Sequence, residues 1–143
     1  MNADNDISAC ANCLCQASRQ AARAITSAYD RRLRPHRIRT TQFTILANLM
    51  LRGSTALGAL AKELGLERTT LTRNLALLDA KGWVAIRPGD TDSRARIITV
   101  TQTGRSRVHE AYPDWRKVQE QVSGAFGEAG VNALHKLAGT AIG

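Results

Sequence analysis

The chain has 143 residues, the size of one domain and too short for two independent hydrophobic cores of ordinary size. It carries 20 Lys and Arg against 12 Asp and Glu, a formal net charge of +8, and 16 of the 20 basic residues are Arg. This excess favours an anionic partner, and because Arg forks onto phosphates and base edges, it points to nucleic acid more than to a membrane surface. No stretch approaches the roughly 20 apolar residues that span a bilayer, and the acidic, polar start is the reverse of a secretory signal. We therefore expect a cytosolic protein with a single domain, 1–143.

Two amphipathic helices are expected first. Apolar residues recur every three to four positions from Leu14 to Leu33, which is the helical period, and a proline shortly afterwards should end this helix. The same period returns between Phe43 and Met50, with Thr40 or Thr41 as the N-cap. Gly53 should terminate the second helix.

Two shorter helices follow, separated by a tight turn. The third is predicted to begin near Thr55 and to end at Gly65. The dipeptide Gly65-Leu66 is too short for anything but a turn, and 67–81 is again helical. The apolar stripe of this fourth helix consists of Leu71, Leu75 and Leu78.

The hydrophobic period then changes to that of strands. Residues 83–87 and 94–100 are rich in β-branched side chains, and 88–93 is a cluster of turn formers, so we predict a β-hairpin with a charged tip. Thr103 can cap a last long helix, which Pro113 should kink or divide before a final helix near the C-terminus.

Two helices joined by a glycine turn and followed at once by a hairpin are typical of a winged helix-turn-helix, a mainly α fold with a small β-hairpin wing. Because a major groove about 12 Å wide accepts one helix, the outward face of 67–81 should contact DNA. Its short hydroxyls and one central Arg suit phosphate anchoring and a bidentate contact to guanine. Alternatively, the three threonines only cap the helix and keep its surface polar. Thr is a poor helix former, however, so this explanation accounts for them less well. The predicted DNA-binding residues here are Arg68, Thr69, Thr70, Thr72 and Arg73.

Acidic and basic residues alternate at the tip of the predicted hairpin. We expect the Asp92 carboxylate to brace an Arg that extends toward a narrow, A·T-rich minor groove. Arg94 is the candidate for that contact, and Arg96 is also expected to bind DNA. Alternatively, these charges only keep the loop soluble and protect an edge strand.

A combined pattern across 41–104 is more specific than a helix-turn-helix alone. It consists of Thr41-Gln42-Phe43, Leu60-Ala61-Lys62-Glu63-Leu64-Gly65-Leu66-Glu67-Arg68-Thr69-Thr70-Leu71-Thr72-Arg73, Gly82-Trp83-Val84, and Asp90-x-Asp92-Ser93-Arg94-x-Arg96 with Gly104. The pattern resembles the multiple antibiotic resistance regulators, the MarR family. The resemblance implies a homodimer with interleaved N- and C-terminal helices that binds a palindromic operator, usually as a repressor, until a ligand or oxidation releases it. Dimerisation helices are then expected at 11–34 and 104–143, and the DNA-binding lobe at 41–103.

Three cysteines, Cys10, Cys13 and Cys15, fall within six positions. On an unbroken helix Cys15 points away from the other two, so three thiolates could bind one ion only if the helix began after Cys13 or the partner chain contributed a cysteine. We expect the cluster to sense oxidation or a thiophilic metal or metalloid. The resemblance offers a precedent, since one branch of the family senses peroxides or hypochlorite through a cysteine in the first helix. Alternatively, these small apolar residues pack a dimer interface.

A competing trigger is a small aromatic acid or lipophilic anion lodged between the dimerisation helices and the DNA-binding lobe. Arg19, Arg23 or His36 could bind such an anion. The sequence lacks an apparent nucleophile-base pair and a phosphate-cradling glycine loop, so we expect neither an enzyme nor a required cofactor. A function of a different class is an architectural protein that coats DNA without sequence preference.

Overall fold

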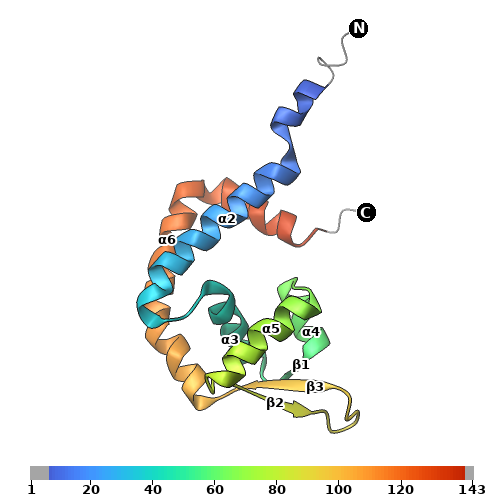
Figure 1. The fold of residues 1–143 in the computed structure, drawn as a ribbon. Helices are drawn as coiled ribbons and strands as arrows, with labels where there is room; N and C mark the ends of the chain where they lie inside the picture. The colour runs from blue at the N-terminus through green and yellow to red at the C-terminus, as the bar shows by residue number, and fades with distance from the viewer. Residues whose placement is uncertain (1–6, 141–143) are drawn as a thin grey trace.

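The computed structural model describes residues 7–140, and it is mainly helical with a small sheet. In chain order the elements are η1 (Ile7–Asn12), α2 (Leu14–Leu33), η2 (Arg34–His36), α3 (Thr40–Arg52), β1 (Thr55–Ala56), α4 (Leu57–Leu64), α5 (Arg68–Ala80), β2 (Val84–Pro88), β3 (Arg96–Val100) and α6 (Gln102–Ala138). Figure 1 shows two levels: α2 and the end of α6 lie together near both termini, and α3, α4, α5 and the sheet form a lobe below them. The predicted winged helix-turn-helix class is confirmed.

Helix α2 has the predicted bounds, and it extends away from the lobe with little cover. Leu33, at its end, is its one buried residue. The helix stops before Pro35, which lies in η2, and Arg37 then adopts a left-handed φ of 55°. The backbone N–H of Thr40 donates to Asp30 Oδ1 at 2.7 Å, so the end of α2 is bonded to the start of α3.

Glycine closes the turn between α4 and α5, as its position predicts. Gly65 has a φ of 62°, which favours glycine because other residues meet a steric penalty there. Leu66 N–H donates to the carbonyl of Ala61 at 3.0 Å and completes the helix end. The turn thereby fixes the angle at which α5 leaves α4.

The start of the third helix differs from the prediction. Thr55 and Ala56 form the short strand β1, and α4 begins only at Leu57. Thr55 pairs with Ile98 and Ala56 pairs with Ile97 of β3. A strand of two residues is too short to show alternation, so periodicity could not separate it from the helix that follows.

The predicted hairpin is present as β2 and β3. The sheet is antiparallel in the order β1-β3-β2, with Val84 opposite Val100 and Pro88 opposite Arg96. β3 is therefore the central strand, and it joins the wing to the body of the lobe.

The two predicted N-caps were wrong. Helix α3 is capped by Arg39, whose backbone N–H donates to Gln42 Oε1 at 3.1 Å, so Thr40 is already the first helical residue. Helix α6 is capped by Thr101 and not by Thr103: the Thr101 hydroxyl accepts from the backbone N–H of Gly104 at 3.1 Å. Strand β3 ends at Val100, where the predicted strand ends, and the very next residue, Thr101, already serves as the cap.

Helix α6 is interrupted at a glycine and is not divided at Pro113. Gly127 adopts φ 72° and ψ 170°, and the helix resumes beyond it, whereas Pro113 lies inside the helical run. A non-helical torsion at Gly127 has little steric cost, while the Pro113 ring removes only one backbone hydrogen bond. No helix among residues 7–140 is both long and apolar enough to cross a bilayer.

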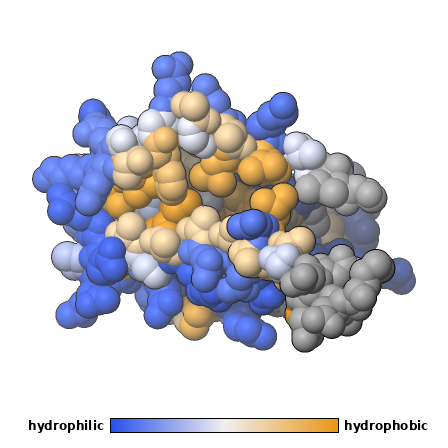
Figure 2. Space-filling view, turned by 90° about the horizontal axis from the view of Figure 1, so that it is seen from above, coloured by the Kyte–Doolittle hydropathy of each residue, from blue (hydrophilic) through white to orange (hydrophobic). Residues whose placement is uncertain are grey.

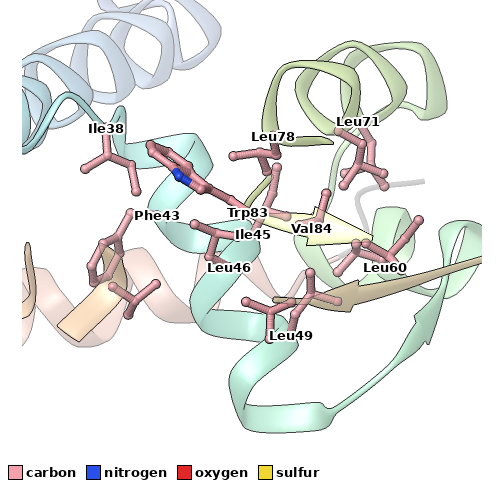
Figure 3. Packing of buried hydrophobic residues seen from close by; sticks show 14 of the residues in the cluster. Ile38, Phe43, Ile45, Leu46, Leu49, Leu60, Leu71, Leu78, Trp83 and Val84 are labelled. Atoms are coloured by element: carbon pink, nitrogen blue, oxygen red, sulfur yellow. The ribbon is translucent and has the colours of Figure 1, made fainter. Parts of the chain in front are cut away.

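The hydrophobic core lies inside the lobe. Figure 3 shows its side chains converging from α3, α4, α5 and the sheet. Leu46, Leu49, Leu60, Leu71 and Ile98 are completely buried. Burial of each such side chain stabilises the fold by about 1.5–3 kcal/mol, so the lobe has its own source of stability and can hold α5 rigidly.

Candidate nucleic-acid interface

Helix α5 presents its polar side to solvent. Leu71, Leu75 and Leu78 are at most 1% exposed and attach the opposite side to the core. The residues predicted to bind DNA, Arg68, Thr69, Thr70, Thr72 and Arg73, are all exposed. No acidic side chain lies among them and two are Arg, so the charge of this face is complementary to the negative charge of a DNA groove. We call these five residues the α5 face.

The end of α5 is fixed by a junction around Trp83, which the sequence analysis named only as part of a motif. The Trp83 ring is 5% exposed, with Lys81 Nζ 4.4 Å from its centroid and Arg107 Cζ 5.6 Å from it. The Trp83 carbonyl accepts from Thr101 N–H at 3.0 Å. A Cβ on Gly104 would collide with that same carbonyl oxygen. The junction thus connects the segment that follows α5 to the start of α6.

The wing carries exposed basic residues, but Asp92 acts differently from the prediction. Asp92 Oδ1 accepts the backbone N–H of Arg94 at 3.0 Å, so the carboxylate shapes the turn. This hydrogen bond is to the main chain and not to a guanidinium, because the side chain of an Asp in a turn readily reaches a backbone amide two residues later. Arg94 and Arg96 are both exposed, and Arg96 Nη1 donates to the Ser93 carbonyl at 3.4 Å.

The upper level of the molecule has an exposed apolar surface. Figure 2, which looks down on α2 and the end of α6, shows hydrophobic residues gathered in a hollow with polar residues around it. The large exposed hydrophobic residues on these two helices are Leu14, Tyr112, Phe126, Leu134 and Leu137. Exposed apolar surfaces rimmed by polar residues occur at protein interaction sites and in ligand-binding grooves.

Comparison with known proteins identifies this arrangement. A sequence model of the MarR family matches residues 38–95. The Mycobacterium tuberculosis transcriptional regulator MosR, in complex with DNA, is 39% identical, with a TM-score of 0.80 over 88% of this chain and 91% of that chain. The chain belongs to the MarR family.

Two further relatives agree. A second MosR structure is 36% identical, with a TM-score of 0.75 over 88% of this chain and 95% of that chain. An uncharacterized HTH-type transcriptional regulator of Bacillus subtilis (strain 168), YwoH, is 25% identical over 82% of this chain and 85% of its own length. The protein is therefore a DNA-binding transcriptional regulator of the MarR family, and its relatives are regulators and not enzymes.

The cysteines of this MarR-family chain are exposed and free. Cys10 lies in η1, Cys13 is the N-cap of α2, and Cys15 lies in the first turn of α2. The helix does begin after Cys13, which is the condition for bringing the thiols together in one chain. Even so, no three His, Cys, Asp or Glu residues within 7–140 are placed to hold a metal ion. Within the described residues, one chain therefore provides accessible thiols without a preformed metal site.

A basic pocket separates α2 from α5. Its volume is about 680 Å³, and its charged lining residues are Asp30, Arg31, Arg34, Arg37, Arg39 and Lys81. Asn74 and Leu77 of α5 form part of its wall, so the pocket touches the helix that carries the α5 face. Neither Arg19 nor Arg23 lines it, because both lie nearer the start of α2, and His36 is bonded elsewhere. The three residues predicted to bind an anion, Arg19, Arg23 and His36, are therefore not among the residues that line this pocket.

A cluster of polar and aromatic residues joins α2 and η2 to α6. His36 Nε2 donates to Asp114 Oδ2 at 2.7 Å, and Arg32 Nε lies 3.2 Å from Asp114 Oδ1. The hydrogen bond from His36 lowers the pKa of Asp114 below its ordinary value, and the charge of Arg32 adds to this effect against an opposing contribution from burial. Tyr29 donates to Gln119 beside this cluster, and burial raises the pKa of Tyr29.

Proposed function

We propose that this MarR-family protein is a homodimeric repressor that binds a palindromic operator with the α5 helices of its two subunits. The observation that carries the proposal is the α5 face, which is exposed, free of acidic residues and anchored from behind by three buried leucines. The domain division follows: 41–103 binds DNA, and 11–34 with 104–143 form the dimer.

Each residue of the α5 face has a chemical role in this proposal. The hydroxyls of Thr69, Thr70 and Thr72 bind phosphates or base edges, and Arg68 at the start of the helix contacts the backbone. Arg73 lies at the centre of the face, where its guanidinium donates two hydrogen bonds to guanine. In the wing, Arg94 and Arg96 reach the neighbouring minor groove, held by the turn that Asp92 shapes.

The exposed apolar surface on α2 and α6 supports the dimer. Leu14 is 84% exposed and Leu137 is 63% exposed, values that a partner subunit would reduce. Two copies related by a two-fold axis present two α5 helices to successive major grooves, which matches an inverted repeat. The dimer also doubles the net charge, so binding should fall steeply as salt rises.

The experiment that tests this function is selection of bound fragments from random DNA, followed by competition. We expect enrichment of one inverted repeat, and a scrambled fragment of the same length should compete far less well. Enrichment without a common sequence would favour the architectural function, in which the protein coats DNA without sequence preference.

Release of DNA is proposed to follow oxidation of the cysteine cluster. A hydroperoxide transfers one oxygen atom to a thiolate, which becomes a sulfenic acid while an alcohol or water leaves. A second cysteine of the same or the partner chain then condenses with the sulfenic acid, forming a disulfide and releasing water. Support comes from the exposure of Cys10, Cys13 and Cys15 at the start of the dimerisation helix, where a new cross-link can move α2.

A thiophilic metal or metalloid is the other ligand that these thiols could bind, and it would need cysteines from both subunits. The triple Cys→Ser variant tests both triggers. Peroxide, hypochlorite or a thiophilic metal should release DNA from the wild type but not from the variant. Equal release from both proteins would leave the anion as the trigger.

The pocket between α2 and α5 favours a second candidate trigger, an aromatic or lipophilic anion. Its lining contains five basic side chains and one carboxylate, so an anion bound there would be attracted by the positive charge and would pack against the pocket wall. It would also contact α5 directly. Arg34→Gln should weaken the release of DNA by an aromatic acid such as benzoate. Arg19→Gln is the matched control, because Arg19 lies outside the pocket; equal effects of both variants would contradict this site.

A further inference from the structure

We propose that Arg32, His36 and Asp114 form a joint that positions the DNA-binding lobe, and that protonation of His36 tightens this joint and raises operator affinity. The inference rests on the proposed function, because it requires an operator whose half-sites demand one spacing of the two α5 helices. It concerns residues outside the α5 face, the wing, the cysteine cluster and the basic pocket.

The location of the three residues is the first argument. Asp114 lies on α6, which runs from the wing to the upper level of the molecule, as Figure 1 shows. Arg32 lies at the end of α2, and His36 lies in η2, just before α3 enters the lobe. One carboxylate therefore binds the scaffold helix α2 and the segment that leads into the lobe.

The neighbouring contacts make this point the connection between the two levels. Trp115, next to Asp114, stacks on Phe43 of α3 with ring centroids 5.8 Å apart, and it lies 6.4 Å from Tyr29 of α2. Arg37, immediately after His36, has a left-handed φ of 55° that marks a sharp change of chain direction. A loss of the His36 contact is thus transmitted to the angle between α2 and α3.

Charge gives the joint its dependence on pH. The charged groups of the joint are Asp114 itself, Arg32 and Lys117, which act on Asp114, and Arg34, which lies with His36 in η2. Asp114 is the one acid among them, and it contacts His36 directly. A neutral His36 keeps a hydrogen bond to Asp114, whereas a protonated His36 adds an ion pair. Histidine is the side chain whose charge ordinarily changes between pH 5 and 8.

A tighter joint should raise operator affinity, because it narrows the range of distances between the two α5 helices before binding. The side chains of His36 and Asp114 are 22% and 30% exposed, so solvent screens the pair and the effect is modest. We expect wild-type affinity to be about two- to fivefold higher at pH 6 than at pH 8, beyond any change seen with a control variant.

The test measures operator affinity at constant ionic strength from pH 6 to pH 8 for the wild type, His36→Gln and His109→Gln. Glutamine keeps hydrogen-bonding capacity but cannot become charged, and His109 is an exposed histidine elsewhere on α6. The wild type and His109→Gln should share the rise at low pH, and His36→Gln should lack it. Parallel curves for the wild type and His36→Gln, or a wild-type affinity that rises with pH, would overturn the proposal.

A second measurement separates positioning from a general loss of fold. The wild type should bind an operator with one base pair added between the half-sites more weakly than the selected operator. Asp114→Asn should show a smaller difference in affinity between these two operators. Glu110→Gln is the matched control, because it removes the same charge one turn earlier on α6. Unchanged discrimination by Asp114→Asn would contradict the joint. Equal binding of operator and scrambled DNA by the wild type at every pH would instead contradict the proposed function.

Discussion

Arg73 is the side chain on which base recognition should depend most, because it lies at the centre of the α5 face. We expect Arg73→Ala to lower operator affinity by about 1–3 kcal/mol and to relax sequence preference. Arg68→Ala is the matched comparison: loss of a phosphate contact should weaken operator and random DNA alike. Competition binding distinguishes the two, and an equal loss on random DNA for Arg73→Ala would contradict its base-reading role.

At the residue scale, the sequence predicted which side chains are exposed on α5 better than it predicted local bonds. The positions of Leu71, Leu75 and Leu78 determine which face of a helix is buried, so the location of Arg73 followed from spacing alone. The hydrogen-bond partner of Asp92 and the cap of α6 both change if the backbone register shifts by one or two residues. Spacing contains no information at that precision, and both predictions therefore needed correction.

Packing between elements is most tightly constrained at Gly104, where α6 meets the Trp83 carbonyl. We expect Gly104→Ala to reduce the free energy of unfolding by about 1–3 kcal/mol, because its Cβ would overlap backbone atoms that cannot move freely. Gly124→Ala is the control: a Cβ there has no neighbour within 4 Å, so the substitution should be neutral or stabilising. Urea denaturation measures both, and equal stability of the two variants would contradict the tight junction.

The wing should contribute affinity at the flanks of the operator. Arg94→Ala is expected to weaken binding by about 1–3 kcal/mol on operators with A·T-rich flanks, and less where the flanks are G·C-rich, because a narrow minor groove attracts an inserted Arg. Titration of both operator types checks this difference. Unchanged affinity on both would show that Arg94 only solubilises the hairpin.

At the element scale, long periodic segments were predictable and short irregular ones were not. Helix α2 and the hairpin followed from patterns of many residues. Strand β1 has two residues, and its pairing with β3 depends on a segment more than 40 positions away in the sequence. The break at Gly127 was missed because a proline is the stronger local signal, while a glycine breaks a helix only where packing requires it.

The exposed apolar surface makes a prediction about the whole molecule. Replacing Leu134 and Leu137 by Glu should convert the dimer to a monomer and abolish operator binding while the lobe remains folded. Sedimentation velocity measures the association state. Leu51→Glu is the control, since Leu51 is 86% exposed on α3, outside the proposed dimer interface on α2 and α6. A monomeric wild type, or a variant that remains dimeric, would contradict the proposed interface.

The basic pocket illustrates what the sequence could give at this scale. The excess of Arg indicated an anionic partner, above all nucleic acid, and an anion between the helical scaffold and the lobe was considered as a competing trigger. Which arginines meet there depends on the turn at η2, which carries Arg34, Arg37 and Arg39 toward α5 and turns His36 toward Asp114. That turn includes Arg37 in a left-handed backbone conformation, which no pattern of residues in the sequence predicts.

The most direct test of the account is a hydroxyl-radical footprint of the wild-type protein on the selected operator. Two α5 helices related by a two-fold axis should protect two half-sites arranged as an inverted repeat, with centres one helical turn of about 10 base pairs apart or a multiple of it. Arg73→Ala should weaken both halves equally. Continuous protection without an inverted repeat, or protection of a single half-site by a monomer, would contradict the central claim.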